Sequence, residues 1–478
     1  MSLTCPRSLL SIRRALPGLL AALTLPSFAA LPTSNSTIAI NHVNVIDATG
    51  SPAQDDMLVV IKGSRIAAIT HSAGAAIPPG AKLVDGSGKF LIPGLWDIHV
   101  HTIFGEWVPE NRDVTLPLFV ANGITGVRDM GGDLPALKVW RSAIAKGSLL
   151  GPRMVIAGPM LDGPIPHFPS SAPVKDAAAG RKVVDDLVRE GVDFIKIQSY
   201  IPRDGYFAAA REAKRLHIPF VGHVPDVIRA SEASNLGQKS IEHFTGIFEA
   251  CSTDEDALLK GGRGPGRSVT TYNADRAKAI IALMARNQTW QVPTLVWERG
   301  QWLIDKPDIY HADIEKYAPV AWREKTWPMF TKSILAEMDT DPLPQRERYV
   351  QMEFEMVKQM RDAGVPFLAG TDTAAGVSIL PGFSLHEELE IFVEAGMTPM
   401  EALQTATLNP ARFLGRTRDL GTVSSGKLAD LVLLDANPLE DIHNTRKIAA
   451  VVLAGRYLDR AALDGMLSNA EAAAAKAH

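Results

Sequence analysis

Two histidines separated by one residue, His99 and His101, close an apolar run that begins at Phe90. Side chains at positions i and i+2 of a strand point to the same face, so both imidazoles would project together from the end of one buried strand. This arrangement suits the chelation of one divalent metal ion. Such pairs also occur as ordinary strand histidines, so the pair alone leaves both interpretations open.

Further residues that can bind metal or transfer protons lie in or directly after later apolar runs: Lys196, His223, His243 and Asp372. A lysine in the apolar run 194–198 is costly to bury as a cation unless it is paired or neutralised. Carbamylation by carbon dioxide would turn it into an anionic bridging ligand. Each residue also has a structural interpretation: an ion pair for Lys196, a satisfied core histidine for His223 or His243, and a helix cap for Asp372.

The elements that must position these residues are predicted strands, which alternate with helical patterns. Eight apolar segments have strand character: 96–101, 126–129, 153–157, 194–198, 220–224, 240–244, 291–296 and 367–371. Eight strands and helices over about 300 residues predict an α/β fold, a (β/α)8 TIM barrel. Barrel enzymes carry their chemistry at the C-terminal strand ends, and all six candidate residues fall there.

Helix signals support the alternation. A helical pattern around residues 183–188 stops at Gly191, and Thr398 to Glu401 form a capping box with Pro399 at the first helical position. Both ends of the mature chain are instead rich in short strands, around residues 38–69 and 429–458, with a hairpin turn at Lys62-Gly63. We expect these ends to form one composite β-sandwich domain.

The N-terminus has the pattern of a secretory signal peptide. Three arginines precede a short apolar stretch at residues 15–25, and Ser27-Phe28-Ala29 has the spacing of a cleavage site. A disordered or anchoring N-terminus is the alternative. The domains expected are a signal peptide (1–29), the two parts of the sandwich (30–92 and 418–462), the barrel (93–417) and a helical or flexible tail (463–478). The mature protein would be secreted, periplasmic or extracellular, by the general or the twin-arginine route.

The composition argues against nucleic acid as a binding partner. The 478 residues are 46% hydrophobic with a formal net charge of −4, and the sequence has no basic patch of the kind that binds nucleic acid. The apolar stretch at residues 15–25 is too short to span a bilayer, so no membrane association is expected after cleavage. Cys251 is the one cysteine left after cleavage, and we expect it to be an inert buried thiol. We also expect a homo-oligomer.

The sequence resembles the metal-dependent amidohydrolase superfamily over essentially the whole mature chain. Its motifs match in order, from His99-X-His101 to Asp372, and Gly421 to Leu431 is similar to the segment that returns to the terminal sandwich. Within the superfamily the chain is most similar to the branch of imidazolonepropionases and Xaa-Pro dipeptidases. This branch includes ochratoxin A hydrolases, among them bacterial amidohydrolases that degrade ochratoxin.

The resemblance implies two zinc ions per chain. One would be held by His99, His101 and Asp372, the other by His223 and His243, with carboxylated Lys196 as a bridging ligand. A hydroxide bridging the ions would attack the scissile carbonyl, and Asp372 would take its proton and return it to the leaving amine. Independently of the resemblance, the carbamate, Asp372 and a hydroxide would offset most of the charge of two dications.

Substrate-binding residues are harder to assign. His167 and Tyr200 lie in the loops after the third and fourth predicted strands, and we propose them as hydrogen-bond donors to a substrate carbonyl or carboxylate. Arg128, at the end of the second strand, could hold a carboxylate or form a structural ion pair with Asp129. Five of the eight tryptophans lie between residues 290 and 327; they could favour an apolar substrate group or pack the core of this insertion.

The leading functional hypothesis is hydrolysis of an amide bond to a C-terminal amino acid, in a small amide or short peptide substrate. This is the reaction of a dipeptidase, a carboxypeptidase or an ochratoxin hydrolase, which releases ochratoxin α and phenylalanine. The alternatives are hydrolysis of a cyclic amide, as in imidazolonepropionase, and a catalytically silent exported binding protein on the same scaffold. All six ligand positions are kept, which argues against the silent protein.

Overall fold

The computed structural model describes residues 37–261, 264–306, 313–337 and 341–477. The predicted signal peptide lies outside these residues. None of the helices in the described part of the chain has the length and apolarity needed to span a bilayer.

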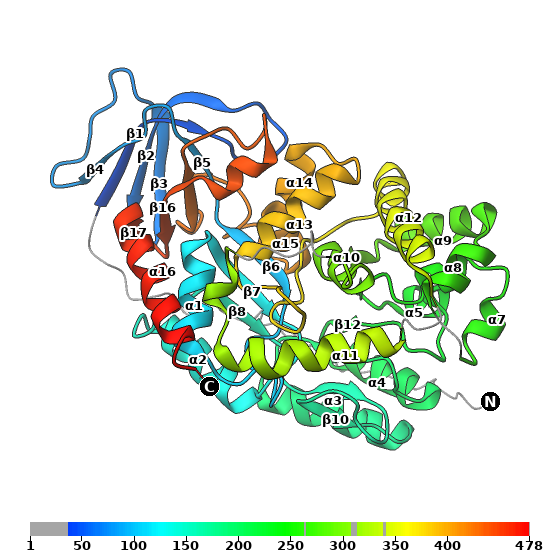
Figure 1. Cartoon of the computed structure of the whole chain (residues 1–478). Helices are drawn as coiled ribbons and strands as arrows, with labels where there is room; N and C mark the ends of the chain where they lie inside the picture. Colours follow the sequence, from blue (N-terminus) through cyan, green and yellow to red (C-terminus); the bar gives the residue numbers. More distant parts are fainter. Residues whose placement is uncertain (1–36, 262–263, 307–312, 338–340, 478) are drawn as a thin grey trace, which may run out of the picture.

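Both ends of the chain contribute to one eight-stranded sheet, which lies at the upper left of Figure 1. Its strands are β1 (Thr37–Val45), β2 (Gln54–Lys62), β3 (Arg65–His71), β4 (Lys82–Asp85), β5 (Phe90–Pro93), β15 (Leu431–Leu434), β16 (Ile448–Leu453) and β17 (Arg456–Asp459). The two ends meet where β15 pairs antiparallel with β5, with Leu434 opposite Phe90. The predicted turn at Lys62-Gly63 is confirmed, since β2 and β3 pair with Lys62 opposite Arg65.

Parallel strands occupy the middle of the chain and pair in two groups, β6-β7-β8 and β10-β9-β11-β12-β13-β14. They are β6 (Leu95–Val100), β7 (Ile124–Asp129), β8 (Arg153–Ile156), β9 (Met160–Asp162), β10 (Ser171–Pro173), β11 (Ile195–Ile197), β12 (Phe220–Gly222), β13 (Ser240–Glu242) and β14 (Trp290–Val292). The backbone N–H of Asp193, just before β11, donates to the carbonyl of Ile156 in β8. The two groups are therefore joined by the backbone at this edge.

The structure differs from the sequence-based prediction at two of the eight expected strands. The strand expected at 291–296 ends at Val292, because Pro293 has no N–H for the ladder and a helix begins at Leu295. The segment expected as the eighth strand, residues 367–371, makes only an isolated bridge, Phe367 with Gln291, and Thr373 just after it bridges Val100. It nevertheless lies between β14 and β6, because it bonds to the backbones of both.

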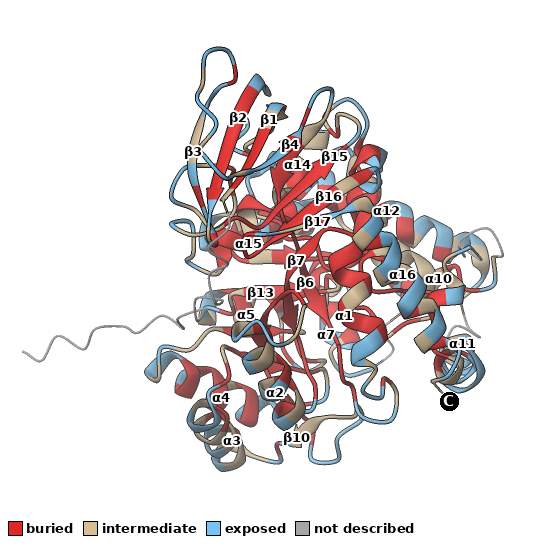
Figure 2. Cartoon of the chain, turned by 90° about the vertical axis from the view of Figure 1, so that its left-hand side faces the viewer, coloured by how far each residue is buried: buried red, intermediate tan, exposed pale blue. Residues whose placement is uncertain are grey.

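Helices cover the outside of these strands, as the burial colours of Figure 2 show. Those that follow the strands include α1 (Arg112–Ala121), α2 (Leu134–Ala145), α3 (Ala177–Glu190), α4 (Arg203–Arg215), α5 (Ala230–Leu236), α9 (Ala274–Asn287), α12 (Leu343–Asp362) and α13 (Phe383–Glu394). The remaining helices that concern the site are α6 (Ile247–Cys251), α10 (Leu295–Trp302), η2 (Glu315–Tyr317), η3 (Trp322–Thr326), α11 (Trp327–Glu337) and α14 (Pro399–Thr405).

The local helix signals are confirmed. Helix α3 ends at Gly191, which has the left-handed conformation that glycine adopts easily. Helix α14 begins with the full capping box of Thr398 and Glu401. Cys251 is fully buried, and burial raises the pKa of its thiol to about 12, as expected for an inert cysteine.

The alanine-rich tail is helical. It forms α16 (Arg460–Ala474), which packs against α1 with Ala470 and Ala474 fully buried. The backbone N–H of Ala321 donates to the carbonyl of Ala477, and Lys316 of η2 pairs with Glu471. The end of the described chain thus contacts the segment that leads into η3 and α11.

A buried ion pair connects the terminal sheet to the parallel strands. Arg153 of β8 donates to Asp430, which precedes β15, with a distance of 2.6 Å between Nε and Oδ2. The other oxygen of Asp430 accepts the backbone N–H of Ala454. Pairing and hydrogen bonding satisfy both charges, as burial requires.

Candidate metal centre and active-site cavity

His99 and His101, at the end of β6, lie against the carboxylate of Asp372 from the segment beside it. The Nε2 atoms of His99 and His101 are 3.4 and 3.2 Å from Oδ1 of Asp372. One ligand atom from each of the three residues falls within 4.8 Å of the others. All three side chains are buried, so the group has the geometry and the donor types of a metal site.

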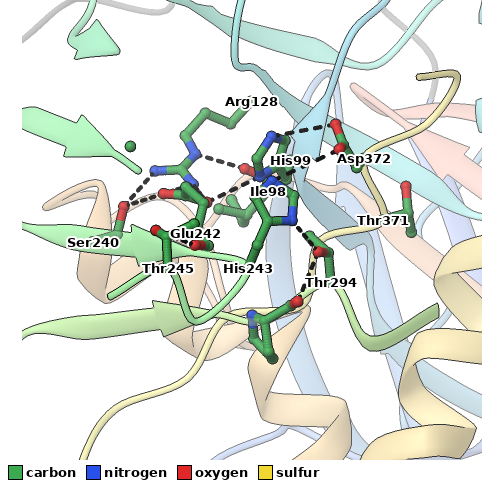
Figure 3. Close-up of polar contacts among 12 residues, drawn as sticks. Ile98, His99, Arg128, Ser240, Glu242, His243, Thr245, Thr294, Thr371 and Asp372 are labelled. Carbon is green, nitrogen blue, oxygen red and sulfur yellow. Dashed lines mark hydrogen bonds and ion pairs between the residues drawn. The ribbon is translucent and has the colours of Figure 1, made fainter. Parts of the chain in front are cut away.

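His223 and His243 follow directly after β12 and β13 and join this group. The ring centroids of His99 and His243 are 4.8 Å apart, and those of His223 and His243 are 5.0 Å apart. Nε2 of His243 is 3.7 Å from Oδ2 of Asp372 (Figure 3). One oxygen of Asp372 therefore faces His99 and His101, and the other faces His243.

Each of the four rings has its Nδ1 atom in a hydrogen bond. The partners are Glu242 Oε2 for His99 (3.0 Å), the Gly131 carbonyl for His101 (2.7 Å), Ser199 Oγ for His223 (2.8 Å) and Thr294 Oγ1 for His243 (2.6 Å). A carboxylate and a carbonyl only accept, so the proton of His99 and of His101 lies on Nδ1. Nε2 of these rings is left with its lone pair for a metal ion.

Thr294 determines the tautomer of His243. Its hydroxyl donates to the carbonyl of Pro293 at 2.7 Å, so its oxygen must accept the Nδ1 proton of His243. Burial also keeps the rings of His99 and His243 neutral, because it lowers the pKa of His99 well below its usual value and that of His243 to about 4. Neutral imidazoles are the form that binds metal.

Lys196 of β11 is 1% exposed, and its Nζ atom has no hydrogen-bond partner among the described residues. Burial lowers its pKa to about 8, against the opposing effect of the Glu242 and Asp372 carboxylates. Lys196 in turn contributes to the lowered pKa of His99, so its cation lies within electrostatic reach of the histidines.

The unsatisfied atoms at this centre fit a metal ion. Among the described residues, His99 Nε2, Asp372 Oδ1 and Lys196 Nζ are buried without a hydrogen-bond partner. Leaving three such atoms unsatisfied would be costly in a folded protein. Imidazole and carboxylate donors that point to one centre remove that cost by binding a divalent cation.

Arg128 does not occupy the position expected for a substrate-binding residue. Its guanidinium is fully buried and donates to both oxygens of Glu242, at 3.0 and 2.9 Å, and to the Ile98 carbonyl at 2.6 Å. It is not among the residues that line the cavity. Arg128 forms a structural ion pair, as the alternative interpretation expected, but its partner is Glu242 and not Asp129.

His167 and Tyr200 line the same cavity as the histidines, which has a volume of about 430 Å³. Their ring centroids are 5.0 Å apart, and Tyr200 is 47% exposed. Asp162 at the end of β9 holds both loops, because its carboxylate accepts the backbone N–H groups of His167 and Tyr200. Both side chains are therefore placed where a substrate could meet them.

Aromatic side chains form much of the remaining cavity lining: Phe104, Trp107, Phe168, Trp297, Trp302, Phe330 and Tyr349. Trp297 and Trp302 come from α10, whereas Trp322 and Trp327 are not in the described lining and pack into a buried cluster that includes Phe104 of the cavity wall. Trp290 contacts Phe413 instead. Each interpretation of the tryptophan-rich segment thus applies to part of it.

Three polar residues of the site were missed by the sequence interpretation. Glu242 immediately precedes His243, and Gln198 follows Lys196 on the same face of the chain; Gln198 is buried, and its Oε1 atom has no partner among the described residues. Glu298 lines the cavity, and burial raises its pKa to about 8. The sequence could have indicated Glu242. It lies on a predicted buried strand, as Arg128 does, and a buried carboxylate and a buried arginine each need a partner of opposite charge.

The chain is similar to a family of known proteins. The model of the amidohydrolase family matches residues 90–458. The chain is 33% identical over 395 residues to an imidazolonepropionase of Shouchella clausii (79% of this chain, 78% of the relative) and 26% identical over 376 residues to the ochratoxinase of Aspergillus niger (74% and 71%). It spans only 54% of another relative, adenine deaminase 3 of Rhizobium meliloti, at 24% identity over 83% of this chain.

Solved structures show the same fold. A putative prolidase from Bifidobacterium longum superposes with a TM-score of 0.64 at 24% identity, over 92% of this chain and 100% of the other. The fold is thus that of the TIM-barrel superfamily, and the expected resemblance, including its branch, is confirmed. The chain belongs to the metal-dependent amidohydrolase family and is a hydrolytic enzyme that acts on amide bonds.

Proposed function

We propose that the chain is a binuclear zinc amidohydrolase that cleaves the amide bond to a C-terminal amino acid, with ochratoxin A as a candidate substrate. The observation that carries the proposal is the convergence of four imidazoles, of which His99 and His101 are fully buried, and Asp372 on one centre within electrostatic reach of Lys196. His99, His101 and Asp372 would hold one ion, His223 and His243 the other, and carboxylated Lys196 would bridge them. The similarity to proteins named ochratoxinase and prolidase supports this choice.

Bound metal would lower the pKa of water and polarise the amide carbonyl. The protein's own residues supply the remaining steps. Asp372, whose carboxylate reaches toward both histidine pairs, would accept the proton of the attacking water and return it to the leaving amine. His167 and Tyr200 line the cavity and can donate hydrogen bonds, and we assign them to a substrate carbonyl or carboxylate.

The shape of the cavity supports an aromatic substrate group. A volume of about 430 Å³ is within the range of small-molecule sites, which is roughly 300–1,000 Å³. Trp107 packs against Phe168 and Phe330 with ring centroids 5.9 and 5.2 Å apart. Such a wall buries apolar area, so a phenylalanine-like group would gain more there than an alanine-like group.

The proposal also includes the finer architecture. The parallel strands would close as a complete (β/α)8 barrel within residues 93–417, and the terminal strands would form a composite sandwich domain. We also propose export after removal of residues 1–29, with the mature enzyme secreted, periplasmic or extracellular, and assembly as a homo-oligomer.

The function is tested by incubating the zinc-loaded enzyme with ochratoxin A and with N-acyl-phenylalanine, and by measuring the phenylalanine released. We expect release from both, and no release by the Asp372→Asn variant. No release from either compound, by a protein that contains zinc, would refute the proposal.

The second candidate is hydrolysis of a cyclic amide, which the 33% identity to an imidazolonepropionase favours. The same preparation can be tested with a cyclic amide of the imidazolone type, with ring opening followed by absorbance. Ring opening without phenylalanine release would reverse the ranking of the two functions.

A further inference from the structure

The four candidate metal-binding histidines differ in what holds their Nδ1 atoms. His101, His223 and His243 bond to a carbonyl or a hydroxyl oxygen, which are neutral partners. Nδ1 of His99 hydrogen-bonds to a carboxylate, that of Glu242, at 3.0 Å. Nδ1 of His243 also faces a carboxylate, that of Glu298, but Oε1 lies 3.8 Å away, beyond hydrogen-bonding distance. The two proposed metal positions therefore differ, because the carboxylate that hydrogen-bonds to a ligand ring among the described residues lies behind His99.

Glu242 forms a buried ion pair with Arg128. Its two oxygens accept from Arg128 Nη2, and Oε1 also accepts from the hydroxyl of Ser240 at 2.5 Å (Figure 3). Arg128 is held in turn by the Ile98 carbonyl. Arg128 and Glu242 are both fully buried, so neither charge is weakened by water.

An anionic acceptor on Nδ1 strengthens the electron donation of Nε2 to a metal ion and fixes the ring orientation. Arg128 Nη2 donates to the same oxygen of Glu242, Oε2, that His99 Nδ1 contacts, and its charge compensates the buried carboxylate. Removing an outer partner of this type lowers metal affinity by about 10–100-fold. A neutral hydroxyl or carbonyl partner orients a ring but provides less of this gain.

We propose that Glu242, held by Arg128 and Ser240, is a positioning residue that makes the His99–His101–Asp372 position the tighter of the two metal sites. The chain then loads metal in a fixed order, and a one-metal form precedes the two-metal form when metal is scarce. The inference rests on the two-metal centre of the proposed function. It gives Arg128 and Glu242 a role in supporting the metal ligand His99, whereas the sequence had suggested substrate binding for Arg128.

The test replaces the charged partner by a neutral one. In the double variant Arg128→Met/Glu242→Gln, the glutamine oxygen can still accept from His99 Nδ1, and no buried charge is left unpaired. Zinc binding to the metal-free protein is titrated against a chromophoric chelator, and the Tm of the metal-free protein is measured in parallel. We expect the Kd of the first zinc to rise about 10–100-fold and the second to stay within about twofold.

The matched control changes the other position. Thr294→Val removes the hydroxyl that accepts from His243, and we expect a smaller rise, confined to the Kd of the second zinc. Equal affinities for the two ions in the unaltered protein would overturn the inference. An unchanged Kd for the first zinc in the double variant would also overturn it. The same holds if this Kd rises only as much as the loss of stability, measured by the lower Tm of the metal-free variant, accounts for.

Failure of the inference and failure of the proposed function are distinguishable. Two ions bound with equal affinity, together with phenylalanine release, would leave the function standing and refute the order of loading. Uptake of only one zinc at saturation would contradict both the two-metal function and the loading order. In that case the positioning role of Glu242 is supported if the single Kd rises in the double variant, and refuted if it does not.

Discussion

The metal-binding end of the cavity and its aromatic wall are built in opposite ways. The histidines project from strand ends, are buried or half-buried, and have every Nδ1 atom hydrogen-bonded. The wall comes from loops and helices outside the strands, including α10 and α11, and its rings contact one another with few hydrogen bonds. The first arrangement fixes positions to fractions of an ångström, whereas the second provides area.

The contrast separates the reaction from its specificity. Strand ends cannot shift without disturbing the parallel strands, so the reaction type is fixed by the fold. Loops and peripheral helices tolerate change, so the substrate can vary among proteins that share the same metal centre. Substitutions at the two ends should therefore have different kinetic effects, which the following predictions test.

The largest effect is expected for Asp372→Asn. Asparagine tolerates the left-handed backbone at this position (φ 59°) and keeps one oxygen ligand, but it cannot accept the proton. We expect kcat for phenylalanine release to fall by about 10³-fold or more, with zinc content largely retained. Zinc is measured by elemental analysis of the same preparation. Near-normal turnover would remove Asp372 as the proton carrier.

Lys196→Ala should also affect the metal end. Loss of the bridging group should release zinc and lower activity by about 10²-fold, and short carboxylic acids should restore part of it by filling the space of the carbamate. Activity is assayed with and without added acetate or propionate. A variant with full zinc and full activity would refute the bridging role.

At the wall, Phe330→Ala should act on binding alone. The ring packs edge-on against Trp107, 5.2 Å between centroids, and lines the cavity without contacting the metal centre. We expect KM for a phenylalanine amide to rise about 10-fold with kcat and zinc content little changed. An equal fall in kcat would mean that the two ends of the cavity are not separable.

Tyr200→Phe removes one hydroxyl and keeps the ring, so its effect should be smaller. Loss of a single hydrogen bond to the substrate predicts a fall in kcat/KM of about 3–10-fold. Steady-state kinetics of Tyr200→Phe beside the unaltered enzyme provide the measurement. An unchanged kcat/KM would leave the tyrosine as a packing residue.

The smallest effect concerns stability. Burial raises the pKa of Glu388 to about 8 from 4.5 in the unfolded chain, so its stabilising contribution is complete below pH 4.5 and is lost as the pH rises through 8. Glu388→Gln keeps the oxygen that accepts the Val296 N–H and cannot ionise. Relative to the unaltered protein, its Tm should rise by about 3 °C more at pH 9 than at pH 6. A constant difference across this range would show that the pKa of Glu388 is not raised in the folded protein.

The sequence predicted the metal-binding end better than the wall. His99 and His101 fall on one face of β6, and the alternation of strand side chains is a local rule that the sequence states directly. Lys196 and His243 were placed in the same way, within a residue or two of the observed strand ends. Local periodicity is enough where the functional side chain is carried by the strand itself.

Long-range pairing could not be predicted in the same way. Arg128 and Glu242 are 114 positions apart, and their ion pair depends on how two strands face each other across the interior. The division of the tryptophans between the cavity lining and the buried cluster behind it depends likewise on loop conformation, which no periodic pattern encodes. The eighth predicted strand lies in the expected place but makes only an isolated bridge.

The tail helix has a consequence for how specificity could evolve. Through Ala477 and Glu471, α16 holds the segment before η3, and Thr326 of η3 donates to the carbonyl of Trp107 in the substrate wall. Changes near the end of the chain could therefore alter substrate preference at a distance and spare the chemistry. Directed-evolution libraries aimed at new amides could begin there, because substitutions in this region do not change the metal-binding residues.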